Sequence, residues 1–222
     1  MIHSCVRRGR VTPGQQRALD ILWPHYGVET VRDLNALFGR DAEKHLEIGF
    51  GNGEALVTMA KAHPENDYLG IDMYRPGVGH LLLQIEAAEL SNVRVMCADA
   101  VEILQDHLPV HSLDSVYLFF PDPWPKRRHD KRRLLQAEFV KLLGQRIKFG
   151  GSLHLATDWK AYAEQMLEVL EDAPFFINCV GGFAPRPPER PLTKFEQRGL
   201  RLGHGVWDLL YQCQDKSLST EN

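Results

Sequence analysis

Three glycines at alternate positions, Gly49, Gly51 and Gly53, form the stretch with the clearest chemical meaning. Leu46 and Ile48 before them indicate a short buried strand, and a helical pattern begins directly after the last glycine. Glycine permits positive φ and close approach by a ligand, and a helix N-terminus presents free N–H groups. This order of strand, loop and helix predicts a cradle for a nucleotide-like cofactor, although such turns also occur without a ligand.

The spacing and an acidic neighbour of these glycines indicate which cofactor the cradle would hold. The dinucleotide fingerprint is Gly-x-Gly-x-x-Gly, whereas this chain has Gly-x-Gly-x-Gly. Glu47 stands two places before the first glycine, where a carboxylate would repel a phosphate but accept hydrogen bonds from a cationic amino group. The motif therefore favours S-adenosylmethionine, which carries an ammonium and a sulfonium but no phosphate.

Acidic residues also follow the next two predicted strands. Tyr68 to Asp72 is an apolar strand whose last residue lies 19 positions after Gly53, close to the spacing at which nucleotide-binding folds place a carboxylate on the ribose hydroxyls. Val93 to Met96 is the third predicted strand, and Asp99 follows it. Asp99 could contact an adenine amino group or could cap the following helix, and the sequence leaves both interpretations open.

The fourth predicted strand, Ser115 to Phe120, continues into the segment P-D-P-W-P-K. Ligands of open α/β sheets bind beyond the carboxyl ends of the strands, so Asp122 and Trp124 would place a carboxylate and an aromatic face at such a site. The flanking prolines restrict the loop. We interpret this loop as catalytic; a purely structural turn is the alternative.

A basic run follows this loop directly. Lys126 to Arg133 contains six Lys or Arg residues in eight positions and is predicted to lead into a helix that extends through Lys148. Such a run is often only a solvated surface, but here it adjoins the predicted catalytic loop. An RNA phosphate backbone bound by it would lie beside the cofactor, as an RNA-modifying enzyme requires.

The overall composition is that of an ordinary globular protein. The 222 residues suit one α/β domain, with 44% hydrophobic and 25% charged residues and a net charge of −3. The N-terminal segment has no apolar core of a secretory signal, and no apolar run could cross a bilayer. Four widely separated cysteines argue against a disulfide framework and a zinc site. We therefore expect a cytoplasmic protein.

The remaining segments complete an alternating α/β pattern. Residues 1–44 are expected to form a basic arm, carrying Arg7, Arg8 and Arg10, and an extension; residues 45–213 the main domain; and residues 214–222 a tail. A long irregular surface loop is expected over residues 181–199. The other predicted elements are a helix over Gly14–His25, a short apolar segment over Val31–Phe38, helices over residues 78–90 and to Leu170, and strands over Ser152–Thr157, Phe175–Val180 and Val206–Cys213.

Five sequence blocks together carry a resemblance to a known family. L-E-I-G-F-G-N-G, Y-L-G-I-D, L-F-F-P-D-P-W-P-K, A-T-D-W and T-K-F-E, in this order, resemble the bacterial tRNA (guanine-N7)-methyltransferases over nearly the whole chain. The resemblance implies a Rossmann-like class I methyltransferase fold with a seven-stranded, mostly parallel sheet. It also implies S-adenosylmethionine as methyl donor and a guanine in the variable loop of tRNA as acceptor, giving 7-methylguanosine.

The same resemblance implies roles for individual residues. Asp122 is the catalytic candidate, and cofactor contacts fall on Glu47, the three glycines, Asp72, Asp99 and Asp122. The family often has Glu where this chain has Asp72. Substrate contacts are expected at Lys126, Asp158, Thr193, Lys194, Phe195 and Glu196, and RNA contacts at Arg128, His129, Asp130, Lys131, Arg132 and Arg133. We expect tRNA as the partner, no metal, no membrane association, and a monomer or weak homodimer.

The chemistry of the acceptor also constrains the mechanism. Guanine N7 carries a lone pair and no proton at neutral pH, so methyl transfer needs in-line placement and no general base. Asp122 would then position the base or stabilise its developing positive charge.

Other functions are also compatible with parts of the sequence. An exocyclic-amine methyltransferase is the rival enzyme, because P-D-P-W resembles Asp/Asn-Pro-Pro-Tyr. A noncatalytic RNA-binding protein is the rival from another class. A nicotinamide dehydrogenase fits least, because the glycine spacing differs.

Overall fold

The structure is a computed structural model that describes residues 9–201, 203 and 205–215. The chain divides into two compact units. We name the unit of Cys5–Pro109 and Pro188–Thr193 the N-terminal unit, and that of Met1–Ser4, Val110–Pro187 and Lys194–Asn222 the C-terminal unit. Arg7 and Arg8 of the predicted basic arm lie outside the described residues, and Arg10 is exposed.

The N-terminal unit contains three parallel strands in the order β3-β2-β1. Every residue of β1 and β2 is buried, which is typical of parallel strands that are covered on both faces. The strands are β1 (Lys44–Ile48), β2 (Asp67–Ile71) and β3 (Val93–Met96), and the helices are α1 (Pro13–Ile21), α2 (Trp23–Tyr26), α3 (Leu34–Phe38), α4 (Glu54–Ala62), α5 (Arg75–Ala87) and α6 (Ala100–Asp106).

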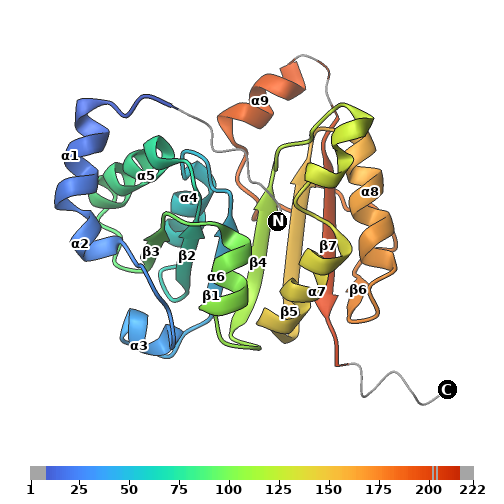
Figure 1. Cartoon of the computed structure of the whole chain (residues 1–222), viewed down its shortest axis with the longest axis horizontal. Helices are drawn as coiled ribbons and strands as arrows, with labels where there is room; N and C mark the ends of the chain where they lie inside the picture. Colours follow the sequence, from blue (N-terminus) through green and yellow to red (C-terminus); the bar gives the residue numbers. More distant parts are fainter. Residues whose placement is uncertain (1–8, 202, 204, 216–222) are drawn as a thin grey trace. The chain divides into compact units, whose positions relative to one another are not determined.

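The predicted N-terminal helix is confirmed but is divided into α1 and α2. Thr12 begins α1 with a capping box, in which its hydroxyl accepts from the Gln15 N–H while the Gln15 side chain accepts from the Thr12 N–H. α1 packs along α5 (Figure 1). A Cβ at Gly79 of α5 would lie 2.9 Å from the Gln15 carbonyl oxygen, so this glycine permits the close approach of the two helices.

The C-terminal unit contains the strands in the order β4-β5-β7-β6. β4 and β5 are parallel, whereas β7 runs antiparallel to both β5 and β6. The strands are β4 (Leu113–Phe119), β5 (Ile147–Thr157), β6 (Phe176–Asn178) and β7 (Trp207–Cys213), and the helices are a 3₁₀ helix (Arg127–Arg132), α7 (Ala137–Arg146), α8 (Lys160–Glu171) and α9 (Lys194–Arg201).

These strands form the seven-stranded, mostly parallel sheet that the sequence predicts, and helices flank it. Two boundaries were predicted wrongly. Lys148 belongs to β5 and not to a helix, because Ile147 pairs with Leu113, and a bulge then shifts the register so that Ser152 pairs with Ser115. Residues 194–201 form α9 inside the segment expected to be an irregular loop.

The error at α9 has a physical cause. Its buried positions include Glu196 and Gly199, neither of which contributes to an apolar helical period.

Among the residues that the structure describes, no helix is long and apolar enough to cross a bilayer, and no three His, Cys, Asp or Glu side chains gather as they would around a metal ion.

Candidate active site

The glycine loop of the N-terminal unit connects β1 to α4 with an unusual backbone. Gly49 and Gly51 have φ of 71° and 59°, values that a side chain would strain. A Cβ at either position would meet no heavy atom within 4 Å, so this side of the loop is open. On α5, a Cβ at Gly77 would lie 2.0 Å from the Gly51 carbonyl oxygen. The loop is therefore packed tightly by α5 and leaves its glycine Cα atoms accessible to a ligand.

Gly53, the third glycine, is the N-cap of α4, with φ of 81° and no side-chain capping bond. The first turn of α4 carries Glu54 as its acidic residue. The predicted succession of strand, glycine loop and helix is confirmed.

Asp72, at the end of β2, holds the glycine loop in place. Its Oδ2 accepts the Gly51 N–H at 2.8 Å, and its Oδ1 accepts the Tyr74 N–H at 2.7 Å. This half-buried carboxylate stands at the carboxyl end of β2, where a ribose hydroxyl could donate to it. The structure thus gives Asp72 a bracing role that the sequence spacing did not indicate.

Glu47 is a buried carboxyl group on β1, immediately before the glycine loop. Glu47 is 3% exposed, and its Oε2 has no hydrogen-bond partner among the described residues. Burial, with a smaller contribution from the charge of Asp72, raises the pKa of Glu47 to about 8, and the Leu56 N–H partly opposes this shift. A cationic amino group would supply both the missing hydrogen bond and the opposite charge.

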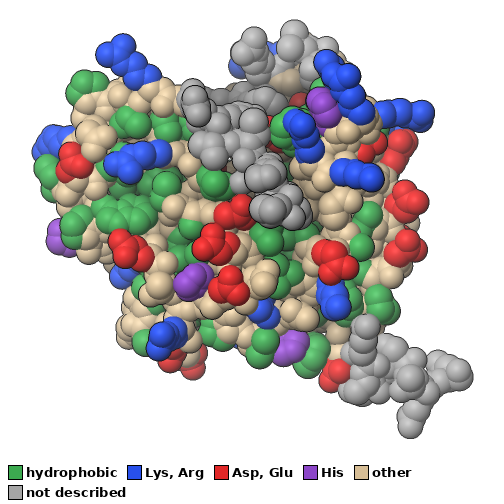
Figure 2. All heavy atoms as spheres, in the orientation of Figure 1, with side chains coloured by type: hydrophobic (Ala, Val, Ile, Leu, Met, Phe, Trp, Pro, Cys, Tyr) green, Lys and Arg blue, Asp and Glu red, His purple; other side chains and the backbone are tan. Residues whose placement is uncertain are grey.

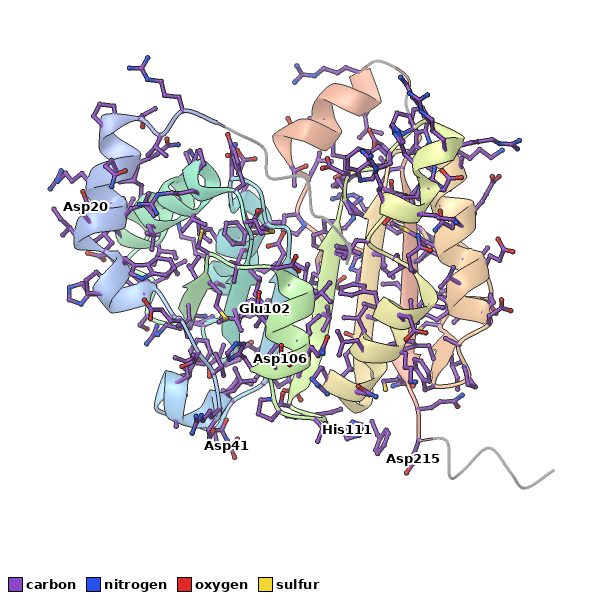
Figure 3. The ribbon with its side chains drawn as sticks, in the orientation of Figure 1. Asp20, Asp41, Glu102, Asp106, His111 and Asp215 are labelled. Carbon is purple, nitrogen blue, oxygen red and sulfur yellow. The ribbon has the colours of Figure 1, made fainter. Side chains whose placement is uncertain are left out.

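Asp99 caps α6. Its Oδ1 accepts the Val101 N–H at 2.8 Å, which confirms the capping interpretation. Figure 3 labels two further acidic residues of this helix, Glu102 in the first turn and Asp106 at its end. The half-buried Asp99 carboxylate follows the carboxyl end of β3, where an adenine amino group could donate to it.

In the C-terminal unit, Asp122 and Asp158 follow neighbouring parallel strands. Phe119 pairs with Ala156 in register, and the Phe120 N–H donates to the Ala156 carbonyl at 2.7 Å. Both carboxylates are half-buried. Because the carboxyl ends of parallel strands share one sheet edge, the two acids lie at the same edge of this unit, where open α/β sheets bind ligands.

Two aromatic residues with positive φ flank Asp122. Phe120 has φ of 51° and Trp124 has φ of 43°. Bulky residues rarely adopt this region, and each such conformation costs on the order of 1–3 kcal/mol. Strain of this kind persists only where surrounding contacts enforce it, so the backbone around Asp122 is held in one defined shape.

The Trp124 side chain packs within its own unit. The His129 ring meets it edge-on at 5.7 Å between centroids, and the Arg132 guanidinium lies 5.0 Å from its ring centre. Burial and the cations at Arg132, Arg128 and Lys126 lower the pKa of His129, which favours a neutral imidazole at pH 7. The aromatic face that the sequence placed at the site therefore also anchors the 3₁₀ helix.

Five of the six cations of the basic run are exposed. Figure 2 shows Lys and Arg side chains gathered over the 3₁₀ helix. Arg133 is instead buried and makes its contacts inside the protein, so the RNA contact predicted for it does not fit the structure. Asp130 pairs with Arg133 at 3.2 Å. The exposed cations are Lys126, Arg127, Arg128, Lys131 and Arg132.

The predicted substrate residues fall in different surroundings. Thr193 is half-buried in the N-terminal unit, whereas Lys126 is exposed and Glu196 is buried in the C-terminal unit. Lys194 and Phe195 lie in α9, and their side chains are outside the described part of the chain. Sequence reasoning missed the burial of Arg190, which is 2% exposed. Its setting in a Pro- and Arg-rich segment gave no hydrophobic pattern to reveal this.

Comparison with solved structures defines the class of the fold. The 30S ribosomal A1408 methyltransferase from an uncultured bacterium matches with a TM-score of 0.60 and 13% identity, over 85% of this chain and 98% of that chain. The aminoglycoside resistance methyltransferase NpmB1 matches with a TM-score of 0.57 and 17% identity, over 81% and 91%. The fold is thus that of the class I methyltransferases.

Sequence relatives define the family within this class. The family model described as "Putative methyltransferase" matches residues 41–209. Proteins named tRNA (guanine-N(7)-)-methyltransferase are 57% identical in Sodalis glossinidius, over 95% of this chain and 90% of the relative, and 58% identical in Halorhodospira halophila, over 94% and 93%. The chain belongs to the tRNA (guanine-N7)-methyltransferase family.

Proposed function

We propose that this protein transfers the methyl group of S-adenosylmethionine to N7 of a guanine in the variable loop of tRNA. The observation that carries the choice of donor is the buried Glu47 Oε2, which lacks a partner among the described residues beside a glycine loop with open Cα positions. An ammonium group would favour the ionised form of this buried carboxyl group, whereas a phosphate would offer it neither a donor nor an opposite charge. Membership of the family supports the acceptor, because the relatives are named for guanine N7 of tRNA.

The N-terminal unit supplies suitable groups for each part of the donor. Glu47 would accept the ammonium, the backbone at Gly49 and Gly51 would lie against the amino-acid portion, and Asp72 and Asp99 would accept from the ribose and the adenine amino group. When bound, the donor supplies an electrophilic methyl group on a sulfonium. The protein contributes its binding, its orientation and a carboxylate that matches its charge.

The C-terminal unit would hold the acceptor. Guanine N7 has a free lone pair, so the protein has no proton to remove and acts by placing N7 in line with the methyl group. Asp122, held between two strained residues, is suited to accept from the N1–H and N2–H₂ edge of the base and to stabilise the positive charge that develops on the purine. The exposed cations of the 3₁₀ helix would bind the tRNA backbone.

The first experiment is incubation of the protein with labelled S-adenosylmethionine and an unmodified tRNA transcript, followed by nucleoside analysis. The expected product is 7-methylguanosine. A methylated exocyclic amine would assign the protein to the rival enzyme class, and cofactor binding without methyl transfer would indicate an RNA-binding protein.

Asp122→Asn tests the role of the catalytic carboxylate. We expect kcat at saturating tRNA and cofactor to fall about 100-fold or more. The amide removes the negative charge, and its NH₂ group would face the N1–H and N2–H₂ donors of guanine. Asp114→Asn is the matched control. It removes a carboxylate from β4 whose oxygens both accept from Lys148 Nζ at 2.8 Å, at the strand's opposite end. Full turnover by Asp122→Asn would contradict the assigned role.

The proposal extends to the setting of the enzyme. A tRNA substrate places its action in the cytoplasm, and the chain would act as a monomer or weak homodimer. Sedimentation of the protein with and without tRNA tests the assembly.

A further inference from the structure

Arg133 differs from the other cations of the basic run. Its side chain is 5% exposed, whereas the five other Lys and Arg residues between positions 126 and 132 are exposed. A phosphate contact requires a cation that reaches the surface. The position of Arg133 in the basic run suggests a phosphate contact, whereas its burial suggests a role inside the protein.

The guanidinium of Arg133 joins three segments of the C-terminal unit. Its Nε donates to the Pro123 carbonyl at 2.8 Å, and its Nη1 donates to Gln165 Oε1 on α8 at 2.5 Å. Its Nη2 lies 3.2 Å from Asp130 Oδ1 on the 3₁₀ helix. The guanidinium also stacks over the Tyr162 ring, 5.1 Å from its centre. These contacts use the planar fork that distinguishes Arg from Lys.

The loop around Asp122 needs such an external donor. Three of its residues, Pro121, Pro123 and Pro125, have no N–H, so the loop has few backbone donors with which to brace itself. Phe120 and Trp124 nevertheless hold positive φ, which requires enforcement by neighbouring contacts. The hydrogen bond from Arg133 reaches the carbonyl of the residue that follows Asp122.

The surroundings of Arg133 form a rigid base for this bond. The Tyr162 hydroxyl accepts the Leu135 N–H at 3.1 Å, and Gln165 Nε2 donates to the Leu135 carbonyl at 3.3 Å. Gln136 Nε2 donates to the Arg133 carbonyl at 3.2 Å. The backbone after the 3₁₀ helix is thus tied to α8 by Tyr162 and Gln165, the same two side chains that contact the guanidinium.

We propose that Arg133 is a positioning residue that fixes the Asp122 loop in its reactive shape and makes no contact with tRNA. This inference rests on the proposed function and adds to it. It separates the basic run into cations that bind the substrate and one that acts through the loop, so the two groups should affect different kinetic constants.

The test compares Arg133→Lys with Arg127→Ala. Arg133→Lys keeps the charge but loses the fork, and we expect kcat to fall at least 10-fold while the KM for tRNA and the salt dependence of tRNA binding stay at wild-type values. Arg127→Ala removes an exposed cation of the 3₁₀ helix that Arg133 follows, and we expect a higher KM for tRNA and a slope of log K against log salt that is shallower by about one.

A second variant guards against simple misfolding. Gln165→Ala removes one of the acceptors of Arg133, and we expect a fall in kcat of a few fold, a wild-type KM for tRNA and a thermal midpoint close to that of the wild type. A wild-type kcat for Arg133→Lys would overturn the inference, and so would a rise in KM and a shallower salt slope in Arg133→Ala like those of Arg127→Ala.

The same experiment keeps the two proposals separate. Nucleoside analysis of the wild-type product tests the proposed function, because methylation at another atom would refute it while leaving the comparison of kcat values valid. If no methylation occurs, direct tRNA binding at several salt concentrations still tests Arg133. An unchanged slope in Arg133→Ala supports a buried positioning role, and a shallower slope refutes it.

Discussion

Glu47 connects cofactor binding to the stability of the protein. Its carboxyl group has a pKa of about 8 in the folded protein, against an ordinary value of 4.5, because it is buried. The folded state therefore binds a proton more tightly than the unfolded state does. The stability that this proton contributes is present below the unfolded value of 4.5 and is lost as pH rises through about 8.

This linkage predicts a pH-dependent effect of Glu47→Gln. The amide cannot ionise, so the variant should not lose this contribution as pH rises. The free energy of unfolding of the variant minus that of the wild type should therefore increase by roughly 1.4 kcal/mol per pH unit between about pH 5 and pH 8. Denaturant unfolding at pH 5, 6.5 and 8 measures this difference. Isothermal titration with S-adenosylmethionine should show weaker binding by the variant, because the amide has no charge to match the ammonium.

Glu29→Gln is a suitable control, because this residue is exposed and lies in the same unit. We expect its stability difference from the wild type to be nearly constant over this pH range. A Glu47→Gln variant whose stability tracks the wild type at all three pH values would show that Glu47 is ionised in the folded protein. Wild-type cofactor affinity in that variant would remove Glu47 from the binding site.

At the scale of elements, the role of the glycine loop in cofactor binding can be distinguished from the loss of stability that any residue with positive φ causes when it is replaced by alanine. Gly49→Ala and Gly39→Ala form a matched pair, with φ of 71° and 73° and no atom within 4 Å of the added Cβ in either case. Both should lose about 1–2 kcal/mol of stability, because alanine is strained there. Gly39 is the C-cap of α3, so only Gly49→Ala should also lose cofactor affinity.

Chemical denaturation and calorimetric titration of the two variants check this prediction. Equal losses of stability with a loss of S-adenosylmethionine affinity confined to Gly49→Ala would support the loop as the cradle. Equal affinities in both variants would mean that the open side of the loop does not face the ligand.

Elements with strong local signals could be predicted from the sequence. β1 and β2 are continuous buried runs, and the glycines that end β1 mark the turn into α4, so the periodic and turn signals agree. Asp122 and Asp158 could also be placed at one edge of their unit, because β4 and β5 are parallel. These placements follow from local patterns and a topology rule, and the roles assigned to the acids stay predictions.

The features that could not be predicted depend on distant contacts. Arg133 is indistinguishable in sequence from Arg132, and only the positions of Pro123 and Gln165 determine that it is buried. The start of β5 depends on pairing with Leu113 across a bulge, and Lys148 pairs with Asp114, 34 residues earlier. Local composition carries no information on either contact.

At the scale of the whole molecule, total charge and local charge point in different directions. The chain has a net charge of −3, which by itself would disfavour a polyanionic partner. Five exposed cations nevertheless lie within seven positions, from Lys126 to Arg132. Counterion release depends on the phosphates that are actually contacted, so this segment should dominate tRNA binding despite the unfavourable total.

The exposed cations of the basic run predict a steep dependence of tRNA affinity on salt. If all five exposed cations contact phosphates, the slope of log K against log salt should be roughly −3.5 to −4.5, since each contact contributes about 0.7 to 0.9. Replacing both Arg127 and Lys131 by Ala should make the slope shallower by about 1.5. The control replaces Lys61 and Lys141, exposed cations of α4 and α7, and should keep the wild-type slope. Filter binding between about 50 and 300 mM salt measures the tRNA affinity of all three proteins. A flat response of the wild type would exclude the basic run as the tRNA-binding surface. Equal slopes in the two double variants would exclude it as well.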